Sequence, residues 1–294
     1  MTGEHDKTRE KVASAYTDAL ERSKAKGGCC GGGGPTLPAG YEAEHDRHKE
    51  AGDSSFGCGN PLAFAGVEPG QTVLDLGSGA GLDLLIAAER VGPAGRVIGV
   101  DMTDAMIEAA QKNAARAGVD NVEVRKGTIE ELPVEDASVD WVISNCVINL
   151  SPQKERVFGE IARVLKPGGR FAISDIVADE VPERVRNQAE VYSACIGGAI
   201  SEADYAAGLD AAGLSEVEVR LDDGRVLRLP GRAEPPRPGP VAGRPGSGGK
   251  DDLDLSNLYT ADGLLGGAPI PNRVDAILVP GDAGTSARPD LAAR

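Results

Sequence analysis

The five cysteines are the residues of this sequence with the most distinctive chemistry. They are Cys29, Cys30, Cys58, Cys146 and Cys195. A closed zinc site usually takes four ligands from closely spaced pairs, and no Cys-x-x-Cys spacing occurs, so zinc is not predicted. Thiolates bind soft, thiophilic centres, and these thiols come from separate segments that a fold can bring together. The competing interpretation is that the cysteines are small buried hydrophobic residues, as most free cysteines are.

A glycine-rich segment indicates a second candidate site. The stretch VLDLGSGAGLD starts at residue 73, and in it a buried strand reaches Asp75 and is followed by Gly77, Gly79 and Gly81 before a helix. Glycines allow a ligand to approach the backbone amides at the start of a helix. The spacing differs from the G-x-G-x-x-G of dinucleotide-binding folds. Asp101 ends the next strand, where a carboxylate can accept hydrogen bonds from the hydroxyls of a ribose.

Both sites need a scaffold, and from residue 67 the sequence predicts alternating strands and helices. The strands expected are QTVLDLG, GRVIGVD, NVEVRKG, VDWVISNC, GRFAISDIV, SEVEVRL and, near residues 273 to 280, RVDAILVPG. The helices expected between them are LDLLIAAERVG, TDAMIEAAQKNAARAG, QKERVFGEIARVLK and EADYAAGLDAAG. Apolar strands that alternate with helices form a parallel sheet covered on both faces. The predicted fold is α/β, a doubly wound, mostly parallel sheet of seven strands.

Composition divides the chain into three regions. Residues 1–66 hold an amphipathic helix over 8–25, with Val12, Tyr16, Ala19 and Leu20 on one face, and then a cysteine-bearing arm. Residues 67–222 form the α/β domain. Residues 223–294 form a Pro- and Gly-rich loop and tail of a composition typical of disorder, apart from the candidate last strand.

Charge and hydropathy exclude two classes of partner. The formal net charge of −15 argues against nucleic-acid binding, which needs clustered Lys and Arg. No apolar stretch approaches the ~20 residues of a membrane span, and the first thirty residues have no apolar signal segment. We therefore expect a cytoplasmic protein, in a compartment where thiols stay reduced and a disulfide framework is not expected.

The motifs DLGSGAG, GVD and LKPGGRF resemble those of class I methyltransferases that use S-adenosylmethionine. The resemblance identifies residues 67–222 as the methyltransferase domain. It implies that the methionine portion of the cofactor lies against 77–79 and Asn145, the ribose against Asp101, and the adenine against 128–130. The cofactor-binding residues that it implies are Asp75, Gly77, Ser78, Gly79, Asp101, Met102, Thr128, Ile129, Glu130 and Asn145.

A narrower resemblance rests on the stretches FGCGNP, SNCVINLS and CIGGAI. Together with the glycine loop, they resemble the arsenite methyltransferases over residues 10 to 220. The resemblance implies that Cys58, Cys146 and Cys195 bind trivalent arsenic, with arsenite or methylarsenite as substrate. It also implies glutathione or a thioredoxin-type protein as reductant, because methylation formally oxidises arsenic. Trivalent arsenic held by three thiolates keeps a lone pair for the methyl group, so no general base is required.

Two other functions stay open at this point. The chain can be a methyltransferase of an organic small molecule with merely buried cysteines, or an arsenic-binding thiol protein without turnover. Cys29 and Cys30, in KGGCCGGGGP, are interpreted as catalytic thiols that deliver arsenic or form a transient disulfide with a site cysteine. The competing interpretation of that pair is an accidental glycine-rich tract.

Overall fold

The computed structural model describes residues 2–26, 41–57, 59–179, 181, 195–214, 217–221, 226–228 and 273–278. Cys29, Cys30 and Cys58 lie outside these ranges, as does most of the segment 223–294. The predictions that concern those residues therefore lie outside the described part of the chain.

One sheet organises the described residues, in the order β3-β2-β1-β4-β5-β8-β6-β7. The strands are β1 (Thr72–Leu76), β2 (Arg96–Asp101), β3 (Val122–Lys126), β4 (Val139–Asn145), β5 (Leu165–Ile176), β6 (Glu218–Leu221), β7 (Val226–Arg228) and β8 (Arg273–Leu278). The five strands β3-β2-β1-β4-β5 pair in parallel, and β8 runs antiparallel between β5 and β6. Successive strands are added on one side of β1 as far as β3, and then on its other side from β4 onward. In such sheets ligands bind at the carboxyl ends of the strands beside this switch in strand order.

The sheet differs from the prediction in one strand. Seven strands were predicted, and the described residues contain eight, because β7 pairs antiparallel with β6. β7 has only three residues, which are too few to show alternation, and it falls in the region assigned to loop and tail. The candidate last strand is present as β8.

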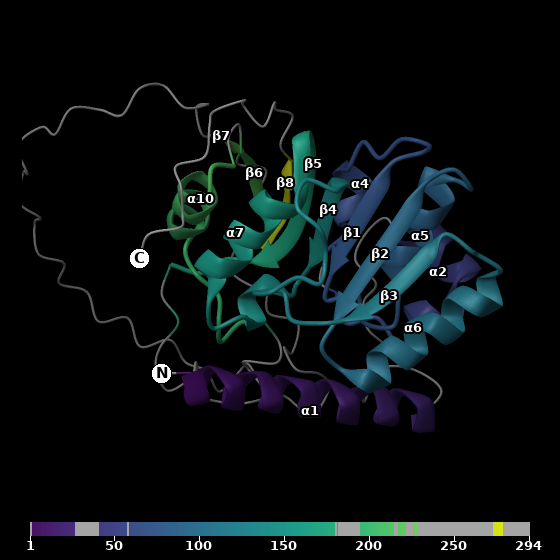
Figure 1. Ribbon diagram of the computed structural model, residues 1–294. Helices are drawn as coiled ribbons and strands as arrows, with labels where there is room; N and C mark the ends of the chain where they lie inside the picture. The colour runs from purple at the N-terminus through teal and green to yellow at the C-terminus, as the bar shows by residue number, and fades with distance from the viewer. Residues whose placement is uncertain are drawn as a thin grey trace, which may run out of the picture.

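Helices cover both faces of the sheet, as a doubly wound fold requires. The helices of the described residues are α1 (Thr2–Lys26), α2 (Glu42–Arg47), α3 (Lys49–Gly52), α4 (Pro61–Phe64), α5 (Leu82–Val91), α6 (Asp104–Ala117), the 3₁₀ turn η1 (Ile148–Leu150), α7 (Lys154–Val164) and α10 (Glu202–Ala211). Figure 1 shows α7 and α10 on one side of the sheet, with α4 and α5 on the other.

Two apolar cores follow from this layering. On the side of α7 and α10, Phe158 and Tyr205 pack with their rings 5.3 Å apart against strand residues such as Val142. On the other side, Leu84 and Ile86 of α5 pack against Val73, within a cluster rich in Ala and Val. These cores hold the strands rigid, so the loops at the strand ends keep fixed positions.

The N-terminal helix α1 is longer than the predicted 8–25 and lies apart from both layers. Val12 and Leu20 are buried, and Tyr16 and Ala19 are partly buried, so the predicted face is the one that packs. Figure 1 shows α1 as the purple helix that runs below the sheet, past the ends of the strands.

Candidate functional site

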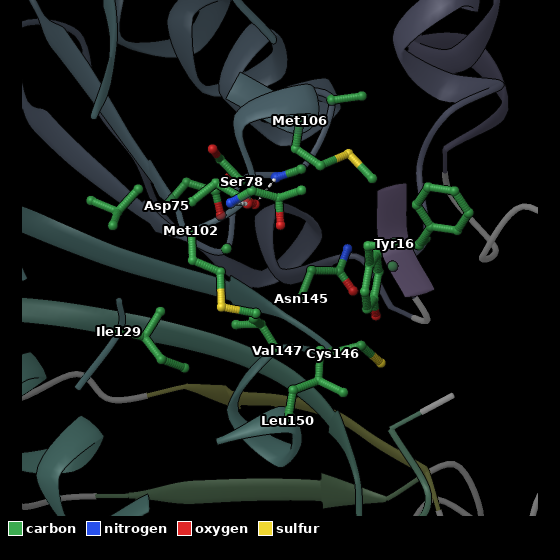
Figure 2. A pocket seen from close by; sticks show the side chains of 18 of the residues that line it. Tyr16, Asp75, Ser78, Met102, Met106, Ile129, Asn145, Cys146, Val147 and Leu150 are labelled. Atoms are coloured by element: carbon green, nitrogen blue, oxygen red, sulfur yellow. Dashed lines mark hydrogen bonds between the residues drawn. The ribbon is translucent and has the colours of Figure 1, made fainter. Parts of the chain in front are cut away.

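A cavity opens at the carboxyl ends of the central parallel strands. It measures about 970 Å³, counting the part open to solvent, and so has the size of a pocket for a small molecule or cofactor. Every residue that the sequence assigned to the cofactor lines it, and so does Cys146. Figure 2 shows Asp75, Ser78 and Met102 around this space, with Asn145 and Cys146 farther along its wall.

The glycine loop after β1 forms one wall with its backbone. Gly77 and Gly79 have φ values of +63° and +51°, which favour glycine. A Cβ on Gly77 would lie 2.3 Å from Cγ2 of Val147, so the loop also needs glycine for space. The Oγ of Ser78 is buried and has no hydrogen-bond partner among the described residues. A buried hydroxyl without a partner fits a site that a polar ligand completes.

Asp101 stands at the end of β2, where the ribose carboxylate was predicted. Its Oδ2 accepts the Gly79 N–H at 3.0 Å, and its Oδ1 accepts the Thr103 N–H at 2.8 Å. Burial raises the pKa of this carboxyl, and these backbone hydrogen bonds oppose the rise. Each carboxylate oxygen can accept a second hydrogen bond, so Asp101 fits a pair of hydroxyl groups.

Glu130 lies in the same wall beside Thr128 and Ile129, and it is tied to other elements. Its Oε1 accepts hydrogen bonds from Oγ of Ser151 at 2.6 Å and from Nε of Arg9 at 3.3 Å. Arg9 belongs to α1, so this part of the cavity is closed by a residue far away in the sequence.

Asn145, at the end of β4, connects three segments. Its Oδ1 accepts the Gly59 N–H at 3.0 Å, and its Nδ2 donates to the Gly59 carbonyl at 2.8 Å and to Oδ2 of Asp83 at 3.1 Å. A Cβ on Gly57 would lie 2.4 Å from that same Nδ2. The side chain of Asn145 therefore binds Gly59 and packs closely against Gly57, the two sequence neighbours of Cys58.

Two buried acids below the loop carry raised pKa values. Burial is the main cause for both Asp75 and Asp83, and Asp83 raises the pKa of Asp75 further. The hydroxyl of Tyr41 donates to Asp83, as Asn145 does, and these bonds partly compensate the burial of its carboxylate. Asp75 is the carboxylate at the end of β1 that the sequence predicted.

Cys146 and Cys195 lie in contact at one end of the cavity. The thiol of Cys195 donates a hydrogen bond to the carbonyl oxygen of Cys146, and both residues belong to one buried apolar cluster. Cys195 is a free thiol and Cys146 is disulfide-bonded, so the two sulfurs are not joined to each other. Burial, followed by the charge of Asp175, raises the pKa of the Cys195 thiol.

Both cysteines have an unusual backbone conformation. Cys146 has φ of +57° and Cys195 has φ of +65°, and Ala137 is the third non-glycine residue with positive φ in the described part of the chain. Such conformations cost energy and concentrate at functional sites. Of the three cysteines predicted to bind arsenic, the structure brings these two together, and Cys58 lies outside the described residues. No cluster of three or more Cys, His, Asp or Glu side chains able to bind a metal occurs within the described ranges.

Helix α1 supplies residues to the cavity that the sequence did not predict for the site. They are Arg9, Val12 and Tyr16. The apolar face of this helix was visible in the sequence, but a helical period shows only that a face is buried and not what it covers.

Comparison with known proteins places this geometry in a family. A family model described as a methyltransferase domain matches residues 67–217. The chain belongs to the methyltransferase domain family. Within the described part of this methyltransferase-family chain, no helix is long and apolar enough to cross a membrane.

Individual relatives are more specific. The chain is 50% identical to an arsenite methyltransferase of Halobacterium salinarum over 204 residues, which are 67% of this chain and 52% of that protein. It is 36% identical to a human arsenite methyltransferase over 201 residues, 64% of this chain and 53% of that protein. These identities confirm the resemblance predicted from the cysteine motifs. This methyltransferase-family chain spans about half the length of these two relatives.

A solved structure agrees with them. The arsenic(III) S-adenosylmethionine methyltransferase of Chlamydomonas reinhardtii shares 39% identity and superimposes with a TM-score of 0.55, covering 61% of this chain and 64% of that one. The Rossmann-like methyltransferase fold predicted for the α/β region is thereby confirmed.

Proposed function

We propose that this protein transfers the methyl group of S-adenosylmethionine to trivalent arsenic bound by thiols. The observation that carries the proposal is the contact of Cys146 with Cys195 at the end of a cavity that is lined by the residues assigned to the cofactor. Arsenite or methylarsenite is the proposed substrate, and detoxification of arsenic is the proposed role. The names of the relatives described above support this choice.

The residues of the cavity fit the proposed cofactor. The unpartnered Ser78 hydroxyl and the amides of the glycine loop would hold its methionine portion, and Asp101 would hold the ribose. Thr128, Ile129 and Glu130 would form the adenine wall. S-adenosylmethionine, when bound there, supplies the methyl group.

The thiols would hold the arsenic by exchange for its hydroxyl groups. Each of Cys58, Cys146 and Cys195 forms a sulfur–arsenic bond while the thiol proton leaves with a hydroxyl group as water. No net proton has to be taken up by a base, which agrees with the absence of a histidine among the residues that line the described cavity. The arsenic keeps its lone pair, and the thiolates orient it.

The apolar surroundings of the thiols would exclude water from this end. Val12, Leu150 and Ile176 are buried in one cluster with both cysteines. Cys146 is disulfide-bonded in the structure, so its thiol becomes available after a two-electron reduction that also adds two protons. We infer that glutathione or a thioredoxin-type protein supplies this reduction, and that the cytoplasm, where thiols are kept reduced, is the site of action.

The test is a product assay with variants of the two described cysteines. The full-length protein is incubated with arsenite, labelled S-adenosylmethionine and a thiol reductant, and methylated arsenic is separated by chromatography. We expect methylarsenicals with the wild type and a loss of at least tenfold with Cys146→Ser or Cys195→Ser. Asn121→Ala serves as the control, because the Asn121 side chain donates hydrogen bonds to the carbonyls of Ala88 and Gly92 and does not line the cavity.

The outcomes separate the alternatives. Tight arsenite binding without any methylated product above the blank would identify an arsenic-binding protein without turnover. Transfer to an organic acceptor that Cys195→Ser leaves unchanged would identify a methyltransferase of organic molecules. We also propose the three regions expected from the sequence: residues 1–66 as the N-terminal helix and cysteine-bearing arm, 67–222 as the methyltransferase domain and 223–294 as loop and tail.

A further inference from the structure

One face of α1 contacts both ends of the cavity. Arg9, Val12 and Tyr16 are spaced by three and four residues, which places them on the same side of a helix. All three line the cavity. The helix therefore forms a continuous wall between the cofactor-type residues and the cysteines.

The N-terminal part of this face is anchored by polar contacts. Nε of Arg9 donates to Oε1 of Glu130 at 3.3 Å, and its NH2 group donates to Oε1 of Gln153 at 2.8 Å. Val12 is 2% exposed and packs in the cluster that contains Cys146 and Cys195. These contacts fix where the next turn of the helix can place its side chains.

Tyr16 occupies that next turn, beside the cysteines. Its hydroxyl group is hydrogen-bonded to the thiol of Cys195, and its ring packs against the same cluster. The ring also meets Phe56 edge-on, with centroids 5.6 Å apart and an interplanar angle of 86°. Figure 2 shows Tyr16 and Cys146 at the same end of the cavity.

The Cys195 sulfur thus has two partners with different properties. Its S–H donates to the Cys146 carbonyl, and its sulfur accepts from the Tyr16 hydroxyl. When the thiol loses its proton to form a bond with an electrophile, it can no longer donate to the carbonyl. The bond from Tyr16 can persist, and hydrogen bonds to charged acceptors are the stronger ones.

We propose that Tyr16 is a positioning residue for Cys195. The Tyr16 hydroxyl group holds the Cys195 sulfur in place before and after this sulfur binds an electrophile. The relevance to arsenic rests on the proposed function. In that reaction the sulfur–arsenic bond replaces an arsenic–hydroxyl bond, the thiol proton leaves in the water formed, and Tyr16 neither gains nor loses a proton.

The first measurement is arsenite binding by the reduced full-length protein without cofactor, by equilibrium dialysis with arsenic counted by mass spectrometry. Tyr16→Phe keeps the ring and removes the hydroxyl group, and we expect it to weaken binding about tenfold. Ser14→Ala, at an exposed position of the same helix, should bind within twofold of the wild type. In turnover, Tyr16→Phe should raise KM for arsenite and leave KM for S-adenosylmethionine unchanged. Equal arsenite affinity of Tyr16→Phe and the wild type would overturn the proposal.

The second measurement does not involve arsenic. N-ethylmaleimide labels the reduced protein, and the peptide that carries Cys195 is quantified over time. We expect severalfold slower labelling in Tyr16→Phe than in the wild type, because the thiolate, which is the form that reacts, has lost the hydrogen bond that stabilises it. Tyr16→Ala, which also opens the apolar cluster to the reagent, should be labelled faster than Tyr16→Phe. The same rate in all three proteins would overturn the positioning role. If labelling differs but the wild type binds no arsenite, the proposed function fails and the role of Tyr16 stands.

Discussion

Asn145 binds both backbone polar groups of Gly59, accepting from its N–H at 3.0 Å and donating to its carbonyl at 2.8 Å. The two residues are 86 positions apart, and each directly neighbours a cysteine. This double contact holds Gly59 at the carboxyl end of β4. Asn145 also explains the glycine at position 57, because its side chain leaves no room for a Cβ there.

Asn145→Ala tests the role of these two hydrogen bonds. The variant loses the hydrogen bonds to Gly59 and Asp83, and a loss of partners for buried polar groups costs ~1–3 kcal/mol of unfolding free energy. We expect that loss in urea unfolding, together with at least a tenfold loss of methylarsenical production. Asn121→Ala should lose stability through its own amide bonds but retain activity. Unchanged activity of Asn145→Ala would show that the hydrogen bonds between Asn145 and Gly59 are not needed for the site.

Gly77→Ala tests the cofactor wall. The new methyl group would lie 2.3 Å from Cγ2 of Val147, at a residue with φ of +63°. We expect S-adenosylmethionine binding, measured by calorimetry, to weaken by at least tenfold. Gly70→Ala is the matched control, because Gly70 has φ of +85° and nothing within 4 Å of the added carbon. It should cost ~1–2 kcal/mol of stability through backbone strain and leave cofactor affinity within twofold.

Much of this architecture follows from local patterns. Alternating apolar strands and helices predict a parallel sheet, and a parallel sheet collects the ends of its strands at one edge. For that reason Asp75, Asp101 and Asn145, which lie at or next to the ends of three strands, were predicted at one site and line one cavity. Their spacing along the chain and the order of the elements contain that information.

Contacts between distant segments do not follow from such patterns. The face of α1 was predicted, but its target required the position of the cavity, so Arg9 and Tyr16 were missed as site residues. The binding of Asn145 to Gly59 depends on the conformation of the loop that carries Gly59, which no periodic pattern of the sequence encodes. The positive φ of Cys146 and Cys195 is likewise a result of tertiary packing, since cysteine has no preference for that region.

Gly198→Ala tests how the segment carrying Cys195 docks onto the segment carrying Cys146. A Cβ on Gly198 would lie 1.8 Å from the carbonyl oxygen of Asn149. Asn149 belongs to η1, which follows Cys146 in the chain. Because that contact is backbone, the two segments must separate, at a cost of ~1–3 kcal/mol. We expect a lower urea midpoint and faster N-ethylmaleimide labelling of Cys195. Gly159→Ala, in a helix with open space around the added carbon, should be neutral or stabilising by up to ~1 kcal/mol. Slow labelling in Gly198→Ala, as in the wild type, would contradict this docking.

Asp175 is expected to make stability depend on pH. Burial raises its pKa from 3.8 to about 7, although the carboxylate accepts the N–H groups of Asn149 at 3.1 Å and of Ile176 at 3.0 Å. Between these two pKa values the unfolded chain has lost the proton and the folded protein keeps it. The contribution of Asp175 to stability is therefore fully present below about pH 4 and is lost as pH rises towards about 7.

The comparison of Asp175→Asn with the wild type isolates this effect, because the variant cannot titrate at that position. The amide loses a hydrogen bond, since its NH₂ group cannot accept from a backbone N–H, so the variant is less stable at pH 5. Between pH 5 and pH 8 the difference in unfolding free energy should shift by ~3 kcal/mol in favour of the variant, at ~1.4 kcal/mol per tenfold change in proton affinity. Urea unfolding at several pH values measures the shift. Asp120→Asn removes a carboxylate at an exposed position and should show no comparable shift. A difference between Asp175→Asn and the wild type that stays constant over this pH range would mean that Asp175 is already ionised at pH 5, despite its burial.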